Sequence, residues 1–239
     1  MRIVSVDLAY RDYRNFGAVV LEGDRRPARY RLVEITRLHA ETPEPVHTAN
    51  LLIELCEREG VSLLLLDGPQ GWKAPNNGLV HSRICERALN TPAKSGLPGA
   101  VKPANYLPFV SFSIDVFTEL HARGWCRFDP ASWSPGVPTV VESFPLAAWR
   151  CLRLVALRAK SRAREIDIRA GLDALVSLGL VTLGPLPTHD QLQALVAGVA
   201  GLSLLAGYST DYQVVGMAPF FLDGTWREGF IINPLVPTC

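Results

Sequence analysis

The sequence predicts an α/β protein built on a mixed β-sheet, and two observations lead to this fold class. Three short strand-like segments follow one another near the N-terminus, at residues 2–8, 16–22 and 29–35. Turn-forming residues separate them, which favours an antiparallel meander. Residues 47–59 then show helical apolar spacing, and 61–66 form a buried strand. Strand, helix and strand in this order predict a right-handed parallel crossover.

The second half of the chain alternates strand and helix patterns. We expect a helix at 110–123, a strand at 138–142, and helices at about 146–158 and 162–177. This alternation adds parallel strands and flanking helices to the sheet.

A late uncharged segment, 191–210, is about long enough to span a bilayer. It contains glutamines and glycines and has no basic flank, so we expect a helix buried against the sheet. Thr188 and Gln191 have the spacing of a capping box, which places Asp190 in the first turn of this helix. Asp223-Gly224 predicts a tight hairpin turn and a small C-terminal β element.

Composition limits the possible functions. The chain has 239 residues, 48% of them hydrophobic and 20% charged, which fits one large domain over 1–239. A net charge of +1 gives no global attraction for polyanions, so a nucleic acid would need a local patch. Five scattered cysteines without a CxxC pair and an N-terminus unlike a signal peptide predict a cytoplasmic protein with reduced thiols and no membrane partner.

A long insertion is expected at about 70–108, where proline, glycine, asparagine and basic residues dominate. It should be a surface loop with a short helix near 82–89. Its basic residues could grip phosphates while Trp72 and Tyr106 stack a base, although solvated loop charge is the commoner role. These candidate substrate-binding residues are Arg83, Arg87, Lys94 and Lys102. The basic cluster around Arg158, Lys160, Arg162 and Arg164 is more typical of a solvated face.

Carboxylates stand at or near the ends of three predicted strands: Asp7, Asp67 and Glu142. The carboxyl ends of strands border the ligand crevice in an open α/β sheet, so these acids can converge, and Asp190 could be a fourth. Gathered carboxylates without a cation would repel one another, so we expect them to hold Mg²⁺ or Mn²⁺. Each acid alone could merely cap a turn or a helix, but Asp7 within a central strand is costly unless it is paired or coordinated.

The order of SVDLAY, LLLLDGPQGW, RICER, VVESFPLAAW and THDQLQALVAG resembles the domain-of-unknown-function-429 family, described as ribonuclease-H-like nucleases. The resemblance implies a ribonuclease-H-like mixed sheet, with an antiparallel three-strand meander followed by parallel strands. It also implies that Asp7, Asp67 and Glu142 are catalytic metal ligands. In related folds a late helix carries two acids three residues apart, whereas this chain has Asp190 and Gln193.

Three functions therefore compete. The first is a divalent-metal-dependent nuclease or phosphodiesterase that uses Asp7, Asp67, Glu142 and Asp190 on a short or structured nucleic acid. The second is a catalytically weakened member of the fold, suggested by Gln193, that binds nucleic acid, nucleotide or a protein partner without cleavage. A kinase-like or ATPase-like use of the same core ranks last, because such proteins resemble a duplicated core.

Overall fold

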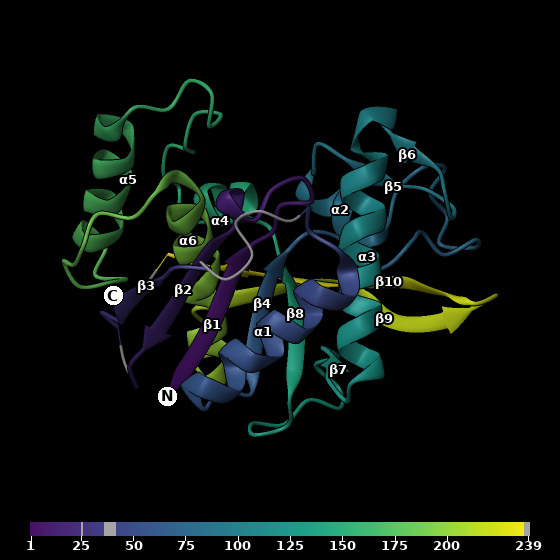
Figure 1. Ribbon diagram of the computed structural model, residues 1–239, viewed down its shortest axis with the longest axis horizontal. Helices are drawn as coiled ribbons and strands as arrows, with labels where there is room; N and C mark the ends of the chain where they lie inside the picture. The colour runs from purple at the N-terminus through teal and green to yellow at the C-terminus, as the bar shows by residue number, and fades with distance from the viewer. Residues whose placement is uncertain (25, 36–41, 237–239) are drawn as a thin grey trace.

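The computed structural model describes residues 1–24, 26–35 and 42–236, and its centre is an eight-stranded sheet (Figure 1). The strand order is β3-β2-β1-β4-β8-β10-β9, and β7 pairs with the first part of β8. The strands of this sheet are β1 (Arg2–Asp7), β2 (Gly17–Glu22), β3 (Arg29–Val33), β4 (Leu63–Asp67), β7 (Cys126–Arg127), β8 (Thr139–Ser143), β9 (Tyr212–Leu222) and β10 (Thr225–Pro234).

The strand directions confirm the predicted mixed sheet. β1, β2 and β3 form an antiparallel meander, β4 joins β1 in parallel, and β8 joins β4 in parallel. The chain thus has the ribonuclease-H-like arrangement of an antiparallel meander followed by parallel strands. The carboxyl ends of β1, β4 and β8 all reach the same edge of the sheet, at the top of the view in Figure 1.

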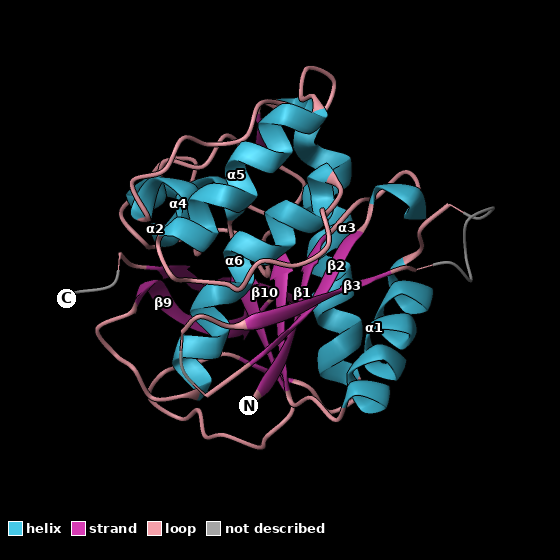
Figure 2. Ribbon diagram, turned by 90° about the vertical axis from the view of Figure 1, so that its left-hand side faces the viewer, coloured by secondary structure: helices cyan, strands magenta, loops and turns pink. Residues whose placement is uncertain are grey.

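Helices cover both faces of the sheet (Figure 2). The α4, α5 and α6 side shares a core with inward residues such as Leu65 and Val141, whereas the α1 and α3 side packs on Leu64 and Leu66. The helices and short elements are η1 (Tyr13–Asn15), α1 (Pro45–Glu59), α2 (Ile84–Leu89), β5 (Lys94–Ser95), β6 (Val101–Lys102), η2 (Ala104–Tyr106), α3 (Leu107–Ala122), α4 (Pro145–Cys151), α5 (Glu165–Ser177) and α6 (His189–Leu205).

Helix α6 lies directly against the sheet and confirms the prediction for the uncharged segment. Its N-cap is Thr188, whose hydroxyl accepts a hydrogen bond from the Gln191 amide at 3.3 Å. Ser5 in β1 donates to the Ala194 carbonyl at 2.7 Å. A Cβ atom at Gly201 would lie 2.3 Å from Leu65 Cδ1, so any larger residue there would force the Leu65 side chain or the helix to move. None of the helices described is both long and apolar enough to cross a membrane.

Three segments differ from their predictions. The 70–108 segment contains α2, β5, β6 and η2, and Trp72 is buried in a small core with Val110, so it is more ordered than a surface loop. The C-terminal hairpin does turn at Asp223, but β10 joins the main sheet beside β8 and is no minor element. Helix α4 ends at Cys151 because Arg153 adopts a left-handed backbone with φ 57°.

The sequence predicts reduced cysteines, and the structure describes four of the five. Cys56, Cys85, Cys126 and Cys151 are free thiols, and Cys239 lies outside the described residues. Burial raises the pKa of the Cys56 thiol to about 12, so this thiol stays protonated at neutral pH.

The contact between α6 and the sheet can be tested with a size exchange. We expect Gly201→Ala to destabilise the protein by about 1–3 kcal/mol, because the added methyl group meets Leu65. Adding Leu65→Ala should recover about 1 kcal/mol relative to the sum of the single effects. Leu55→Ala on the opposite face is the control, and its effect should simply add to that of Gly201→Ala. Additive behaviour of the Leu65 pair in urea unfolding would contradict the close contact.

Candidate active site

Two of the predicted acids lie side by side at the carboxyl edge of the sheet. Asp7 ends β1, Asp67 ends β4, and the two residues are direct partners in the parallel register. Residues in register point to the same face of a sheet, so their carboxyl groups share one side. They interact through a side-chain hydrogen bond, which requires a proton on one of them.

The third acid comes from α6 and approaches across β2. Asp190 lies in the first turn of α6 and is buried. Gly17 of β2 pairs with Asp7, and a Cβ atom at Gly17 would lie only 2.0 Å from the backbone carbonyl carbon of Asp190. The missing side chain at Gly17 therefore lets the beginning of α6 reach the strand that carries Asp7.

The electrostatics of this acidic cluster reflect its crowding. Burial raises the pKa of Asp7 well above its ordinary value, and the charges of Asp67 and Asp190 raise it further. Burial also raises the pKa of Asp67 to about 7. Asp7 and Asp67 therefore ionise less readily than ordinary carboxyl groups, and a nearby cation would favour their charged forms. Asp7, Asp67 and Asp190 are called the acidic cluster below.

Two basic side chains are already in contact with Asp190. Lys160 donates to an Asp190 carboxylate oxygen and, at 2.7 Å, to Asn15 Oδ1. His189 Nδ1 lies 3.0 Å from Asp190 Oδ1, while its Nε2 donates to the Arg158 carbonyl at 3.0 Å. The hydrogen bond to Asp190 raises the pKa of His189, so the imidazolium form is favoured here.

Carboxylate oxygens are chemically suited to Mg²⁺ or Mn²⁺. Nevertheless, no three His, Cys, Asp or Glu side chains among the described residues are grouped so that they could hold a metal ion. Asp7 and Asp67 form a pair, but Asp190 faces Lys160. The donor atoms fit a divalent cation in kind, and the third carboxylate would have to exchange its lysine partner for the ion.

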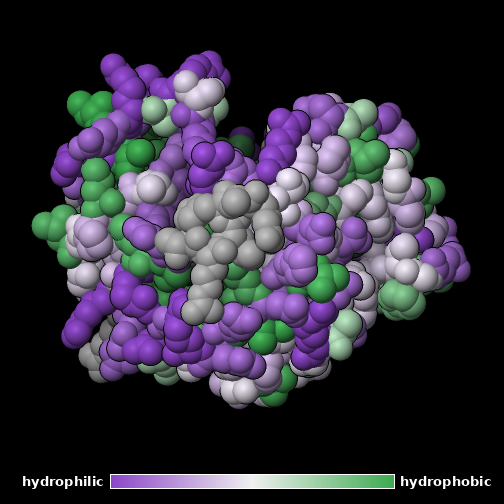
Figure 3. All heavy atoms as spheres, in the orientation of Figure 1, coloured by the Kyte–Doolittle hydropathy of each residue, from purple (hydrophilic) through white to green (hydrophobic). Residues whose placement is uncertain are grey.

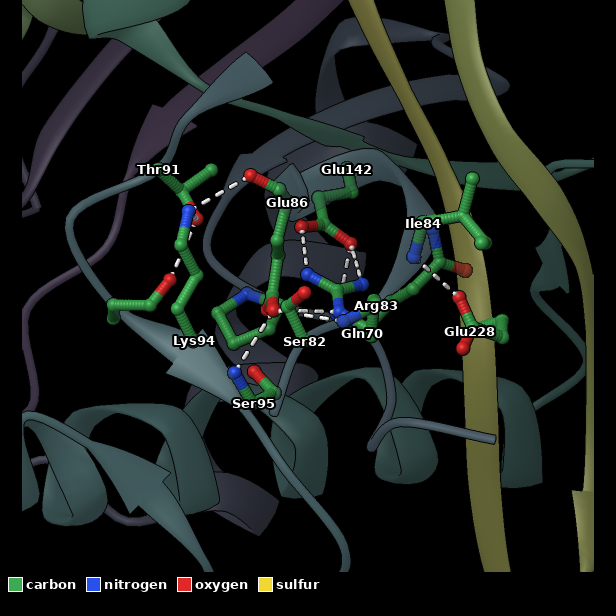
Figure 4. Close-up of polar contacts among 12 residues, drawn as sticks. Gln70, Ser82, Arg83, Ile84, Glu86, Thr91, Lys94, Ser95, Glu142 and Glu228 are labelled. Atoms are coloured by element: carbon green, nitrogen blue, oxygen red, sulfur yellow. Dashed lines mark hydrogen bonds and ion pairs between the residues drawn. The ribbon is translucent and has the colours of Figure 1, made fainter. Parts of the chain in front are cut away.

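Glu142 has different partners from the other predicted acids. In the register of β4 and β8, Ser143 lies beside Asp67, whereas Glu142 lies beside Leu66 and points to the opposite face. Arg83 donates to both Glu142 oxygens at 2.7 and 2.6 Å, and the Gln70 amide donates to one of them at 3.0 Å (Figure 4). A metal ion bound by Glu142 would have to compete with this guanidinium.

Arg83 belongs to a buried ion network and is not a surface cation. Its side chain is 1% exposed, and its Nε donates to Glu86 at 3.0 Å while its other nitrogens bind Glu142 (Figure 4). Glu86 also accepts from the backbone amide of Ser95 at 2.9 Å. This network, which sequence reasoning did not foresee, fixes α2 and β5 against the end of β8.

The other predicted substrate-binding residues lie nearer the surface. Arg87 and Lys102 are exposed. Lys94 donates to the Glu86 carbonyl at 2.9 Å and to the Thr91 hydroxyl at 3.3 Å. Trp72 is buried, so of the two aromatic residues suggested for stacking only Tyr106 is accessible.

A hollow separates two parts of the molecule at the edge where the parallel strands end (Figure 3). The part that carries α5 stands on one side of it, and the part that carries β5 and β6 stands on the other (Figures 1 and 3). Hydrophilic side chains border the hollow on both sides. The exposed basic residues of the chain include Lys160 and Arg162, which precede α5, and Arg87 and Lys102 of the 70–108 segment.

Sequence reasoning missed two residues that contact Asp190 of the acidic cluster, Gly17 and Lys160. A glycine at the beginning of a strand opposite an acid could have signalled a close backbone approach. Lys160 carried no such signal, because its contact with Asp190 joins a loop to a helix that begins 29 residues later.

Comparison with solved structures finds similarity to RuvC from Thermus thermophilus. One RuvC structure is 16% identical with a TM-score of 0.42 and covers 87% of this chain and 97% of its own. Another, T. thermophilus RuvC in complex with a Holliday junction substrate, is 14% identical with a TM-score of 0.38 and covers 87% and 96%.

This likeness concerns the fold and does not extend to an activity. No protein-family model matches the chain, so the resemblance to the domain-of-unknown-function-429 family has no support from a family match. No curated protein matches it either.

The crowded acids predict a pH dependence of stability without added metal. The unfolded chain releases the Asp67 proton near pH 4, and the folded chain releases it near 7, so the folded state binds more protons between these values. Stability should therefore fall as pH rises through this window. The pKa of Asp7 is raised as well, so the Asp7 carboxyl adds to this fall. We expect Asp7→Asn to remove the Asp7 part of the fall and to stabilise the protein at about pH 8 in chelator by about 2 kcal/mol, or 4–8 °C.

Thermal unfolding across the pH range measures this effect. Asp173→Asn, which changes an exposed acid on α5, is the matched control and should leave the pH profile unchanged. A less stable Asp7→Asn protein with an unaltered profile would contradict the repulsion between these carboxyl groups.

Proposed function

We propose that the protein is a divalent-metal-dependent phosphodiester hydrolase that acts on nucleic acid. The observation that carries this proposal is the buried pair of acids Asp7 and Asp67 at the carboxyl edge of a ribonuclease-H-like sheet, with Asp190 near enough for its charge to raise the pKa of Asp7. Gathering buried like charges is unfavourable unless a cation binds them. Such an arrangement is therefore typical of a functional site and of little use for stability alone.

The chain's own residues have distinct roles in this proposal. Asp7 and Asp67 would hold Mg²⁺ or Mn²⁺, and Asp190 would join them after releasing Lys160. The bound ion would supply Lewis-acid stabilisation of the phosphate and a more acidic water. His189 keeps Asp190 in place through its contact at 3.0 Å, and Lys160, once released from Asp190, would bind a phosphate oxygen.

The substrate would lie in the hollow above the acidic cluster. Exposed basic side chains of this part of the molecule, among them Arg87, Lys102 and Arg162, would neutralise the phosphates of the substrate. The net charge of +1 supports a short or structured nucleic acid bound locally over a long duplex bound along its length.

Cleavage assays test this proposal directly. We expect the protein with Mn²⁺ or Mg²⁺ to cut at least one of single-stranded DNA, single-stranded RNA, an RNA–DNA hybrid and a four-way DNA junction. Asp7→Asn should lower the rate by about 100-fold or more, because it removes a charge from the metal ligands. Asp173→Asn should cut as the wild type does. An inactive wild type on all four substrates, or an Asp7→Asn protein that cuts normally, would refute the proposal.

A second candidate is a protein of the same fold that binds nucleic acid without cutting it. Two observations favour it. Lys160 already neutralises Asp190, and Gln193, where related folds carry an acid, accepts a hydrogen bond from the Trp149 indole at 2.8 Å. In this candidate Lys160 permanently takes the place of a divalent cation.

Replacing Lys160 distinguishes the two candidates. If the lysine competes with a metal, Lys160→Gln should tighten Mn²⁺ binding in calorimetry by about 3–10-fold, since removing one nearby positive charge leaves Asp190 free. Lys102→Gln, at an exposed lysine, should bind Mn²⁺ as the wild type does. Absence of Mn²⁺ binding in both the wild type and Lys160→Gln, with oligonucleotide binding retained, would support the non-cleaving candidate.

A further inference from the structure

A cavity of about 160 Å³ opens beside the acidic cluster, at the ends of β4 and β8. A single water needs only about 10–15 Å³ of such space, so this cavity can take a small molecule or a ring. The residues on which the argument depends are Asp67, Ser95, Tyr106, Phe109, Ser143 and Phe144.

The walls of the cavity are mainly apolar and aromatic. Tyr106, Phe109 and Phe144 line it and are each partly exposed. Phe109 packs against Tyr10, with ring centroids 6.3 Å apart. Aromatic rings that are fixed in place and accessible on one side are suited to stacking against a flat ligand.

Two serines among the residues around the cavity have hydroxyl groups without partners. Ser95 is 0% exposed and Ser143 is 1% exposed, and neither side-chain oxygen has a hydrogen-bond partner among the described residues, so each hydroxyl would have to turn toward the cavity to meet a ligand. A buried hydroxyl without a partner costs the protein stability. Two of them in the lining of one cavity therefore indicate a ligand that offers hydrogen-bonding groups at its edge.

The charge around the cavity determines which ligands can enter. Of the described lining residues, Asp67, Glu86 and Glu142 are acids and Arg83 is basic. Arg83 is already bound to Glu86 and Glu142, so it has little attraction left for an anion. A phosphate or carboxylate ligand is disfavoured, and a neutral ring with N–H donors is favoured.

We propose that this cavity binds a nucleobase, stacked on Tyr106, Phe109 or Phe144 and hydrogen-bonded at its edge to Ser95 and Ser143. Both hydroxyls can donate and accept, as the mixed edge of a base requires. The base could belong to a free nucleoside or to a nucleotide unstacked from an oligonucleotide. In the second form the inference rests on the proposed function, because the base would lie next to the phosphodiester held at Asp67.

Free nucleosides provide a test that does not require catalysis. We expect adenosine, guanosine or cytidine to show saturable binding by calorimetry or ligand-observed NMR, whereas inorganic phosphate should not bind in the cavity. Ser95→Ala and Ser143→Ala should each weaken nucleoside binding by about fivefold or more. The same variants should unfold at a slightly higher temperature without ligand, because each removes an unpartnered hydroxyl. Weaker nucleoside binding together with higher stability would not result from a purely structural role of these serines.

A filling variant tests the space itself. Ala93 lines the cavity, so Ala93→Phe should abolish nucleoside binding, whereas Ala170→Phe on the exposed face of α5 should not. Thermal unfolding and circular dichroism show whether each variant is folded. Failure of all nucleosides to bind the wild type, or undiminished binding by a folded Ala93→Phe protein, would overturn the free-nucleoside form.

Oligonucleotides with single abasic positions separate the two sources of the base. An abasic site at one position should reduce binding of a short strand by about fivefold or more if the base enters from a polymer. Unchanged affinity at every abasic position would overturn the polymer form. Nucleoside binding without any cleavage would support the nucleobase cavity and contradict the proposed hydrolase activity. Cleavage that is unchanged by Ala93→Phe and by abasic sites would support the hydrolase activity and contradict the nucleobase cavity.

Discussion

The direct contact of α6 with the sheet is the constraint on which the rest of the site depends. Gly17 in β2 and Gly198 and Gly201 in α6 remove the side chains that would hold the helix away, and Ser5 fixes the helix by donating to the Ala194 carbonyl. A larger residue at these positions would meet backbone or buried leucine atoms. Because the helix lies this close, Asp190 in its first turn reaches the end of β1. The close packing of α6 thus brings the charge of Asp190 near Asp7.

The carboxylates at this edge of the sheet are neutralised in two different ways. Glu142 and Glu86 share Arg83 in a buried network, which makes them a structural unit that joins α2 and β5 to β8. Asp7 and Asp67 have no such basic partner; burial raises the pKa of both, and Asp67 raises that of Asp7 further. The first group contains its own cation, whereas the second has none and can accept an external one, and this difference separates structural acids from candidate catalytic ones.

The fold was largely predictable, and the site only in part. Period-two and helical patterns located the meander, α1, β4 and the capped start of α6, because local spacing encodes them. The same patterns placed Asp7 and Asp67 at strand ends. They could not show that Ser143 and not Glu142 lies beside Asp67 in the sheet, which depends on a register of one residue, nor that Arg83 is buried. Composition alone made 70–108 look like a surface loop, although Trp72 and Val110 give it a small core of its own.

That small core explains why a binding cavity can exist beside the acids at all. A flexible insertion would collapse onto the ends of β4 and β8 or leave them open to water. Here the Trp72 core and the Arg83 ion network hold α2, β5 and η2 at a fixed distance, so the aromatic walls stay apart and the Ser95 and Ser143 hydroxyls remain unpartnered. Two unpartnered hydroxyls lower the stability of the protein, and the rigid surroundings keep them unpartnered despite this cost. Such rigidity is the physical condition for a preformed site.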